Sequence, residues 1–210
     1  VSGHAIVVGA LDDDIDALGA NAGSAHLFQK VGGSWTYTQR VLASDPTVSA
    51  RFGRTVAVYG DRVLVGSTNI DNGAGAVYAF RFGDNSAEFE GRLVADDQAP
   101  SDGFGSALAM DGVTAVVGAR RRNGGTGQFS GAGYVFTRIG TQWAQRARLL
   151  APDPRPDERL GYSVALSGGM AMLGAPYSTS SPCCEQGRAI LFLGSESGWQ
   201  FLRHLSVPDV

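Results

Sequence analysis

Cysteine, lysine and long apolar runs are scarce in this sequence of 210 residues, and each scarcity excludes a class of protein. The two cysteines, Cys183 and Cys184, are adjacent, so the chain has no disulfide framework, and we interpret them as two loop thiols. Lys30 is the only lysine and the net charge is −3, which argues against a nucleic-acid partner. No apolar run approaches the about 20 residues of a transmembrane helix, so we expect no membrane insertion.

Motifs of common enzyme families are also missing from the sequence. It contains no Gly-x-Ser-x-Gly elbow, no His-Glu-x-x-His and no P-loop. The histidines His4, His26 and His204 are scattered, and none has an evident serine or cysteine partner in the sequence. We therefore expect a protein that is not an enzyme and that has no required cofactor.

Glycine, by contrast, is abundant, with 30 residues, and it recurs at regular intervals. Three pairs of residues, which we call head pairs, begin similar stretches 52 and 56 residues apart: Phe52-Gly53, Phe104-Gly105 and Leu160-Gly161. Fourteen residues after the start of each head pair, a second glycine closes an apolar run: Gly66, Gly118 and Gly174. The pattern Ile6-Val7-Val8-Gly9 gives a fourth copy of that run.

Each repeated stretch is typical of four short strands. In one copy, Val56-Ala57-Val58 predicts a first strand, and the tight turn Gly60-Asp61 leads into a second. Glycine and aspartate favour the positive φ of such turns, and the equivalent turns are expected at Asp111-Gly112 and Gly168-Gly169. No segment shows a sustained helical apolar pattern, so helices should be nearly absent.

Four-stranded units of about 50 residues indicate an all-β fold, the β-propeller built from four-stranded antiparallel blades. We expect about four blades, forming a partial propeller. The whole chain, 1–210, is interpreted as a single propeller region with units at approximately 1–51, 52–103, 104–159 and 160–210. The first unit is expected to lack its first strand.

The head pairs, together with Gly9-Ala10, Gly118-Ala119 and Gly174-Ala175-Pro176, resemble the FG-GAP repeat. This family builds the β-propellers of integrin α subunits and of many bacterial secreted and surface proteins. The resemblance implies an extracellular or cell-surface location. Because integrin-like propellers have seven blades, it also implies further blades in the same parent chain. We expect the isolated chain to oligomerise or to be marginally soluble.

Integrin-type repeats often bind calcium in a loop between the first and second strands, but here that connection is a tight turn. Calcium takes about six to eight oxygen ligands, so we expect none at these turns. The sequence resembles the shorter bacterial variant of the repeat in this respect. The remaining calcium candidates are Asp12, Asp14 and Asp16, which share an acidic loop. The alternative interpretation is a solvated acidic loop at the rim.

A second charged loop, Arg120-Arg121-Arg122, fills the equivalent place in the third unit. These arginines are candidates for binding a sulfated glycan or an acidic protein patch through bidentate contacts. The alternatives are a solvated loop tip and a loop that pairs with the acidic loop of another unit.

Aromatic residues and aspartates recur near the unit boundaries. We interpret Trp35, Trp143 and Trp199, with Phe89 in their place in the second unit, as packing between blades rather than as a sugar-stacking platform. In an Asx turn, the side chain of an aspartate or asparagine accepts a hydrogen bond from a nearby backbone N–H. We expect Asp102 and Asp157 to hold the turns between blades in this way. An aspartate also closes the last strand of each unit, at Asp45, Asp96, Asp153 and Asp209.

Three functions are compatible with these features. The preferred one is a non-catalytic binding or adhesion module that recognises protein or carbohydrate through its propeller loops, since loops on a repeated frame acquire ligands. The alternatives are a structural spacer in a large surface protein and a polysaccharide-acting hydrolase or lyase, because fold alone does not fix function.

Overall fold

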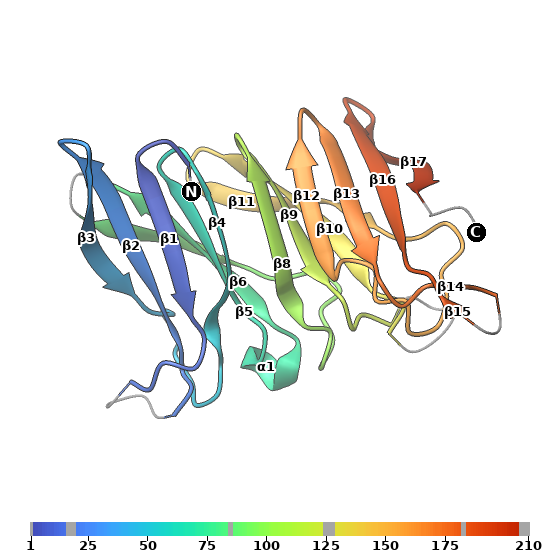
Figure 1. Cartoon of the computed structure of the whole chain (residues 1–210), viewed down its shortest axis with the longest axis horizontal. Coiled ribbons are helices and arrows are strands. Elements are labelled where there is room, and N and C mark those ends of the chain that lie inside the picture. Colours follow the sequence, from blue (N-terminus) through green and yellow to red (C-terminus); the bar gives the residue numbers. More distant parts are fainter. Residues whose placement is uncertain (1, 16–19, 84–85, 124–128, 182–183, 206–210) are drawn as a thin grey trace.

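The computed structural model describes residues 2–15, 20–83, 86–123, 129–181 and 184–205, and it is all-β (Figure 1). The one helical segment, α1 (Ile70–Gly73), is a four-residue turn with two left-handed residues inside it. The predicted near-absence of helix is therefore confirmed for this part of the chain. Cys183 lies outside the described residues, so the interpretation of its side chain as a loop thiol stays a prediction.

Each unit has one main antiparallel sheet, and strands that follow one another within that sheet are hydrogen-bonded neighbours. The first unit has three strands: β1 (Ala5–Ala10), β2 (Ser24–Val31) and β3 (Ser34–Val41). The second has β4 (Phe52–Tyr59), β5 (Arg62–Ser67), β6 (Ala76–Phe82) and β7 (Ala87–Leu93). The third has β8 (Phe104–Asp111), β9 (Thr114–Ala119), β10 (Ala132–Ile139) and β11 (Gln142–Leu149). The fourth has β12 (Ser163–Ser167), β13 (Met170–Ala175), β16 (Arg188–Ser195) and β17 (Gly198–Leu205), with a small hairpin of β14 (Thr179–Ser181) and β15 (Cys184–Glu185).

The four sheets stand side by side in chain order, with the first and fourth at opposite ends of the row (Figure 1). The strands that follow the head pairs, β4, β8 and β12, lie next to one another, and β1 lies next to β4. The predicted fold class, an all-β protein of the propeller type with four-stranded antiparallel blades, is confirmed.

Two-residue turns join the first and second strands, as the sequence predicts. Gly60-Asp61 connects Tyr59 to its ladder partner Arg62, and Gly168-Gly169 is the equivalent turn in the fourth unit. In the third unit the turn is Gly112-Val113, because Asp111 still pairs with Thr114. The prediction of Asp111-Gly112 was therefore wrong by one residue.

The two glycines that define the repeat meet each other across the boundary between units. A Cβ added to Gly9 would lie 1.8 Å from the carbonyl oxygen of Gly53 in the next unit. The same approach occurs between Gly118 and Gly161, where the distance would be 2.1 Å. The glycine of each head pair also has a positive φ, 88° at Gly53, which few other residues tolerate. The spacing of the motif thus reflects a backbone contact between neighbouring blades.

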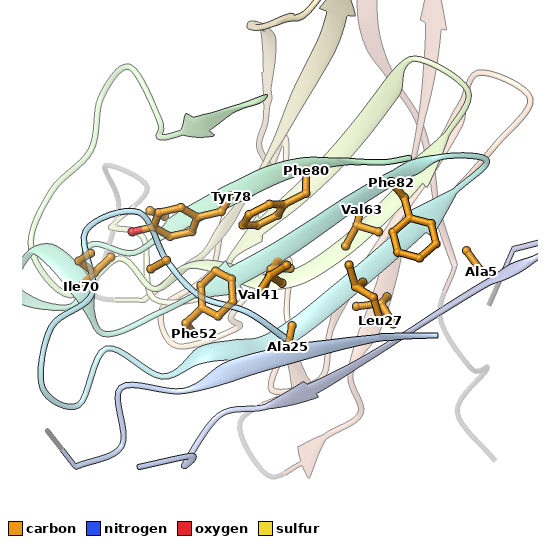
Figure 2. Packing of buried hydrophobic residues seen from close by; sticks show 14 residues of the cluster. Ala5, Ala25, Leu27, Val41, Phe52, Val63, Ile70, Tyr78, Phe80 and Phe82 are labelled. Carbon is orange, nitrogen blue, oxygen red and sulfur yellow. The ribbon is translucent and has the colours of Figure 1, made fainter. Parts of the chain in front are cut away.

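The hydrophobic core is divided into layers that lie between successive sheets. Strand residues alternate between the two faces of a sheet, so Val63 and Val65 pack toward the first unit, whereas Leu64 packs toward the third. In the first layer, Ala25 and Leu27 face Phe52 and Val63 of the second unit (Figure 2). Similar layers join the second to the third unit and the third to the fourth.

The aromatic residues predicted to pack between blades do so unequally. Trp143 and Trp199 pack against the second and third layers, but Trp35 is 41% exposed. Phe89 is not their equivalent: the ladder places Ala87 opposite Phe82, as Trp143 stands opposite Arg138. The inter-blade interpretation therefore holds for Trp143 and Trp199, and the alignment of Phe89 with them was wrong. Trp35 has the register position of Trp143, which packs toward the preceding unit, and no unit lies before the first in these 210 residues, so its packing stays a prediction.

Candidate functional site

Four arginines line a pocket at the boundary between the second and third units. Arg51 and Arg54 flank Phe52-Gly53, the head pair of the second unit, whereas Arg120 and Arg121 follow β9 of the third. The pocket has a volume of about 60 Å³, and no carboxylate lines it. The predicted arginine loop thus contributes two of its three members to a site that also draws on the neighbouring unit.

An irregularity in the β4–β5 ladder places Arg54 at this pocket. Phe52 pairs with Ser67 and Thr55 pairs with Gly66, so Gly53 and Arg54 have no partners across the strand. Bulges of this kind redirect side chains out of a regular sheet. The third unit has the same irregularity, which brings Ser106 to the other side of the pocket.

Arg120 is held in place by the fourth unit. Its guanidinium carbon lies 5.1 Å from the ring centroid of Tyr162, a cation–π contact. Its backbone N–H also lies 3.4 Å from the hydroxyl oxygen of Ser106. The third and fourth units therefore both contribute to the position of this one arginine.

The electrostatics of the pocket are dominated by like charges. Burial lowers the pKa of Arg54, and the positive charges of Arg120, Arg51 and Arg121 lower it further. The nearest ion-pair partner is Asp12, whose Oδ1 lies 3.8 Å from Nε of Arg51, and that carboxylate is largely exposed. Among the described residues, Arg54, Arg120 and Arg121 form no ion pair.

Arg122, the third predicted ligand-binding arginine, has a structural partner set instead. Its Nη2 donates to Asp97 at 2.9 Å, and its Nη1 donates to Asp102 at 3.3 Å. Its side chain is mostly buried, with 16% exposed. Arg122 therefore links the loop after β9 of the third unit to the end of the second unit, and it does not line the pocket.

Asp97 belongs to a clasp that recurs between units. It accepts a hydrogen bond from the hydroxyl of Tyr134 at 2.9 Å and pairs with Arg148. In the preceding repeat, Asp45 accepts from Tyr78 and lies near Arg92. Burial, followed by the neighbouring aspartate, raises the pKa of both tyrosines. The closing aspartate of this repeat was predicted at Asp96, but the position that closes the clasp is Asp97.

The turns between blades are held by buried carboxylates, as expected at Asp102. Its Oδ2 accepts from the backbone N–H of Ala99 at 3.0 Å, and burial raises its pKa. Before the head pair of the fourth unit the same part is played by Glu158, which accepts from the N–H of Arg155 at 3.0 Å. Asp157 is exposed and has a φ of 57°, so the prediction that named it was wrong by one residue.

The acidic loop of the first unit is tied to its surroundings by separate contacts. Asp14 accepts from the backbone N–H of Asn21 at 2.8 Å, and Asp12 lies beside Arg51. Asp16 lies outside the described residues. Among the residues that the structure describes, no three histidine, cysteine, aspartate or glutamate side chains gather around one point. The calcium site at Asp12, Asp14 and Asp16 stays a prediction.

One histidine does have a serine neighbour, which the sequence did not suggest. The hydroxyl of Ser24 lies 3.1 Å from Nε2 of His26, but it donates its proton to Asp13 at 2.6 Å. Ser24 is fully buried. A nucleophile needs an accessible hydroxyl whose proton goes to the base, so this cluster is arranged as a structural network.

Arg51 and Arg54 are the site residues that sequence reasoning missed. Each is an arginine beside a head pair; the Arg51 position has an arginine again at Arg159 in front of Leu160-Gly161, whereas the Arg54 position has Ser106 and Tyr162 in the other units. They could have been found from the contact between units, because the loop between the second and third strands of one unit lies beside the head pair of the neighbouring unit.

Comparison with known proteins agrees with the fold. A search among curated proteins found no match to the chain. In the described part of the chain, no helix is long and apolar enough to cross a membrane. A family model described as the FG-GAP repeat matches residues 35–80, 88–136 and 143–192, and each match contains one head pair. These matches cover more than half of the sequence, and the chain therefore belongs to the FG-GAP repeat family.

Proposed function

We propose that the chain is a non-catalytic binding or adhesion module of a secreted or cell-surface protein, which recognises a protein or carbohydrate ligand through its propeller loops. The observation that carries this proposal is the pocket of Arg51, Arg54, Arg120 and Arg121, because an uncompensated cluster of arginines at a loop face favours a ligand. Family membership supports the same class of function by analogy.

Further blades of the same parent protein form part of the proposal. The outward faces of the first and fourth sheets expose apolar side chains such as Val8 and Met172. The equivalent faces between units are covered by a neighbouring blade. Repeat proteins are stabilised by such contacts between neighbours.

The alternatives are a structural spacer and a propeller hydrolase or lyase. The spacer needs no ligand, so the arginine pocket would have no role in it. The enzyme needs convergent acid and base groups, and in the Ser24, His26 and Asp13 network the serine hydroxyl is buried and donates to the aspartate rather than to the histidine.

The proposal is tested by applying the purified chain to an array of neutral, acidic and sulfated glycans, and to immobilised extracellular matrix proteins. We expect saturable binding to at least one of them, which disappears when the chain is heat-unfolded before application. A parallel panel of polysaccharides measures turnover. Reproducible hydrolysis or elimination would favour the enzyme, and the absence of any binding would favour the spacer.

A further inference from the structure

The arginine pocket has an excess of positive charge that no described group neutralises. Four guanidinium groups line it, and the one carboxylate near them is Asp12, 3.8 Å from Arg51. The sequence as a whole has a net charge of −3, so the positive charge is a local feature. Like charges held close together are unfavourable unless an anion joins them, because each destabilises the charged form of its neighbours.

The size of the pocket limits what this anion can be. Its volume is about 60 Å³, so the space suits a small inorganic anion or one charged group of a larger ligand. Thr68 and Ser106 add hydroxyl groups to the lining. The Ser106 hydroxyl donates to the carbonyl oxygen of Gly118 at 3.1 Å, so its position is fixed.

The arrangement of the arginines points to a tetrahedral group rather than a planar one. A carboxylate has two oxygens, which one or two guanidinium forks already satisfy. Here the four arginines come from two separate segments: Arg51 and Arg54 flank the head pair Phe52-Gly53, and Arg120 and Arg121 follow β9. A sulfate or phosphate group offers oxygens in several directions, and phosphate also has a charge of about −1.5 to −2 at neutral pH.

We infer that the pocket formed by Arg51, Arg54, Arg120 and Arg121 binds a tetrahedral oxyanion, either free or as a sulfate or phosphate ester on a larger ligand. The inference rests on the proposed function, since it names the chemical group that the loop face accepts. The fourth unit contributes indirectly, because Tyr162 supports the Arg120 guanidinium at 5.1 Å.

Isothermal titration calorimetry at constant ionic strength, with chloride as the background anion, tests the inference. The probes are inorganic sulfate, inorganic phosphate, glucose 6-sulfate and acetate. We expect one site per chain for sulfate, phosphate and the sugar ester, and at least tenfold weaker binding of acetate. The double variant Arg54→Gln, Arg120→Gln should bind sulfate at least tenfold more weakly, since it loses two charged hydrogen-bond donors.

The matched control is Arg146→Gln, which removes the same charge from an exposed position on β11 outside the pocket. It should bind sulfate as the unchanged chain does. Thermal unfolding in chloride checks that the double variant is folded. We expect its unfolding temperature to equal or exceed that of the unchanged chain, because the substitutions relieve repulsion among the arginines.

Three results would overturn the inference: no sulfate binding to the unchanged chain, equal binding to the double variant, or equal affinity for acetate and sulfate. The result is separable from that of the proposed function. A glycan or protein that binds the chain when sulfate does not would leave the proposed function standing and overturn the oxyanion site. Sulfate binding without any macromolecular ligand would support the site and count against the binding module.

Discussion

At the scale of single residues, the most buried ion pair joins Arg188 to Glu158. Arg188 Nη2 donates to Glu158 at 2.6 Å, and the two side chains are 5% and 0% exposed. Arg188 also donates to Asp153 at 2.8 Å. Three charged groups therefore meet where the last strand of the third unit leads into the fourth.

Replacing Arg188 with methionine should destabilise the fold, because it leaves Glu158 buried without its partner. The expected loss in the free energy of unfolding is about 3–5 kcal/mol, measured by urea denaturation. The control is Arg81→Met, whose side chain is 52% exposed, and it should change stability by about 0.5 kcal/mol or less. Similar small effects for both variants would contradict the importance of this pair.

Acid should weaken the clasp that contains Asp97. Burial alone would raise the pKa of Asp97, but hydrogen bonds from Arg148 and Tyr134 and the charge of Arg122 outweigh it and place the pKa below its usual value of 3.8. A folded-state pKa below the unfolded one means that Asp97 stabilises the fold above the usual value. This stabilisation is lost as the pH falls through the lower, folded-state pKa.

Urea denaturation at a series of pH values from about 6 down to about 2 measures this loss. At pH 6 the free energy of unfolding of Asp97→Asn should be lower than that of the unchanged chain. The difference between the two free energies should narrow as the pH falls. Asp102, whose pKa is raised by burial and also by the charge of Asp97, acts in the opposite direction, so the measured difference contains the effect of Asp97 on Asp102 as well as its own. A difference that stays constant over the whole range would be inconsistent with the assigned shift.

At the scale of the elements, an interruption of the same kind occurs in every unit. The pairing between the last two strands of each sheet shifts by one residue. The shift falls between Leu27 and Phe28 in the first unit and between Ala79 and Phe80 in the second. The third and fourth units shift at Val135/Phe136 and Leu191/Phe192. Bulges increase local twist, and a repeated bulge gives each sheet the same twist, which lets successive sheets stack.

The contact between glycines of neighbouring units predicts a strong effect of one methyl group. Gly118→Ala places a Cβ 2.1 Å from the carbonyl oxygen of Gly161, which belongs to the backbone and cannot easily move aside. Overpacking typically costs about 1–3 kcal/mol, and we expect the upper end of that range in urea denaturation. Gly91→Ala is the control, because a Cβ there meets no atom within 4 Å. An equally small effect for both would mean that the blades move apart at little cost.

At the scale of the whole molecule, the two ends of the row of sheets have complementary apolar faces. Val8 of the first unit is 48% exposed, but the equivalent Val65 of the second unit is fully buried against its neighbour. At the other end, Met172 is 40% exposed, whereas the equivalent Val116 is fully buried. Each end face therefore has an equivalent inside the row, and there a neighbouring sheet covers it.

We expect the isolated chain to associate head to tail, with the fourth unit of one copy against the first unit of a second. Met172→Glu should lower the average mass measured by light scattering at a given concentration, since it places a charge in that contact. Val48→Glu alters an exposed loop residue away from both faces and should leave the mass unchanged. A monomer at all concentrations, before any substitution, would rule out this association.

The sequence alone determined the repeat, the strand number of a unit and the fold class. These follow from local rules, because glycine spacing, alternating apolar residues and two-residue turns act within a few positions of one another. It located turns and carboxylates less securely: Asp111-Gly112, Asp96 and Asp157 were each one residue from the position that the structure uses. One residue is enough to change the face or the hydrogen-bond partner in a strand, and no local pattern fixes it.

The tertiary structure alone decided which charged residues meet. Arg120 and Arg121 were predicted to act together with Arg122, but Arg122 pairs with Asp97 and Asp102, and the pocket gains Arg51 and Arg54 instead. In the sequence, Arg51 and Arg54 lie more than 60 residues before Arg120 and Arg121. Their meeting depends on the stacking of one blade on the next, and on a bulge that turns Arg54 out of its ladder. Such contacts are set by packing between units, which the repeat pattern implies but does not specify in detail.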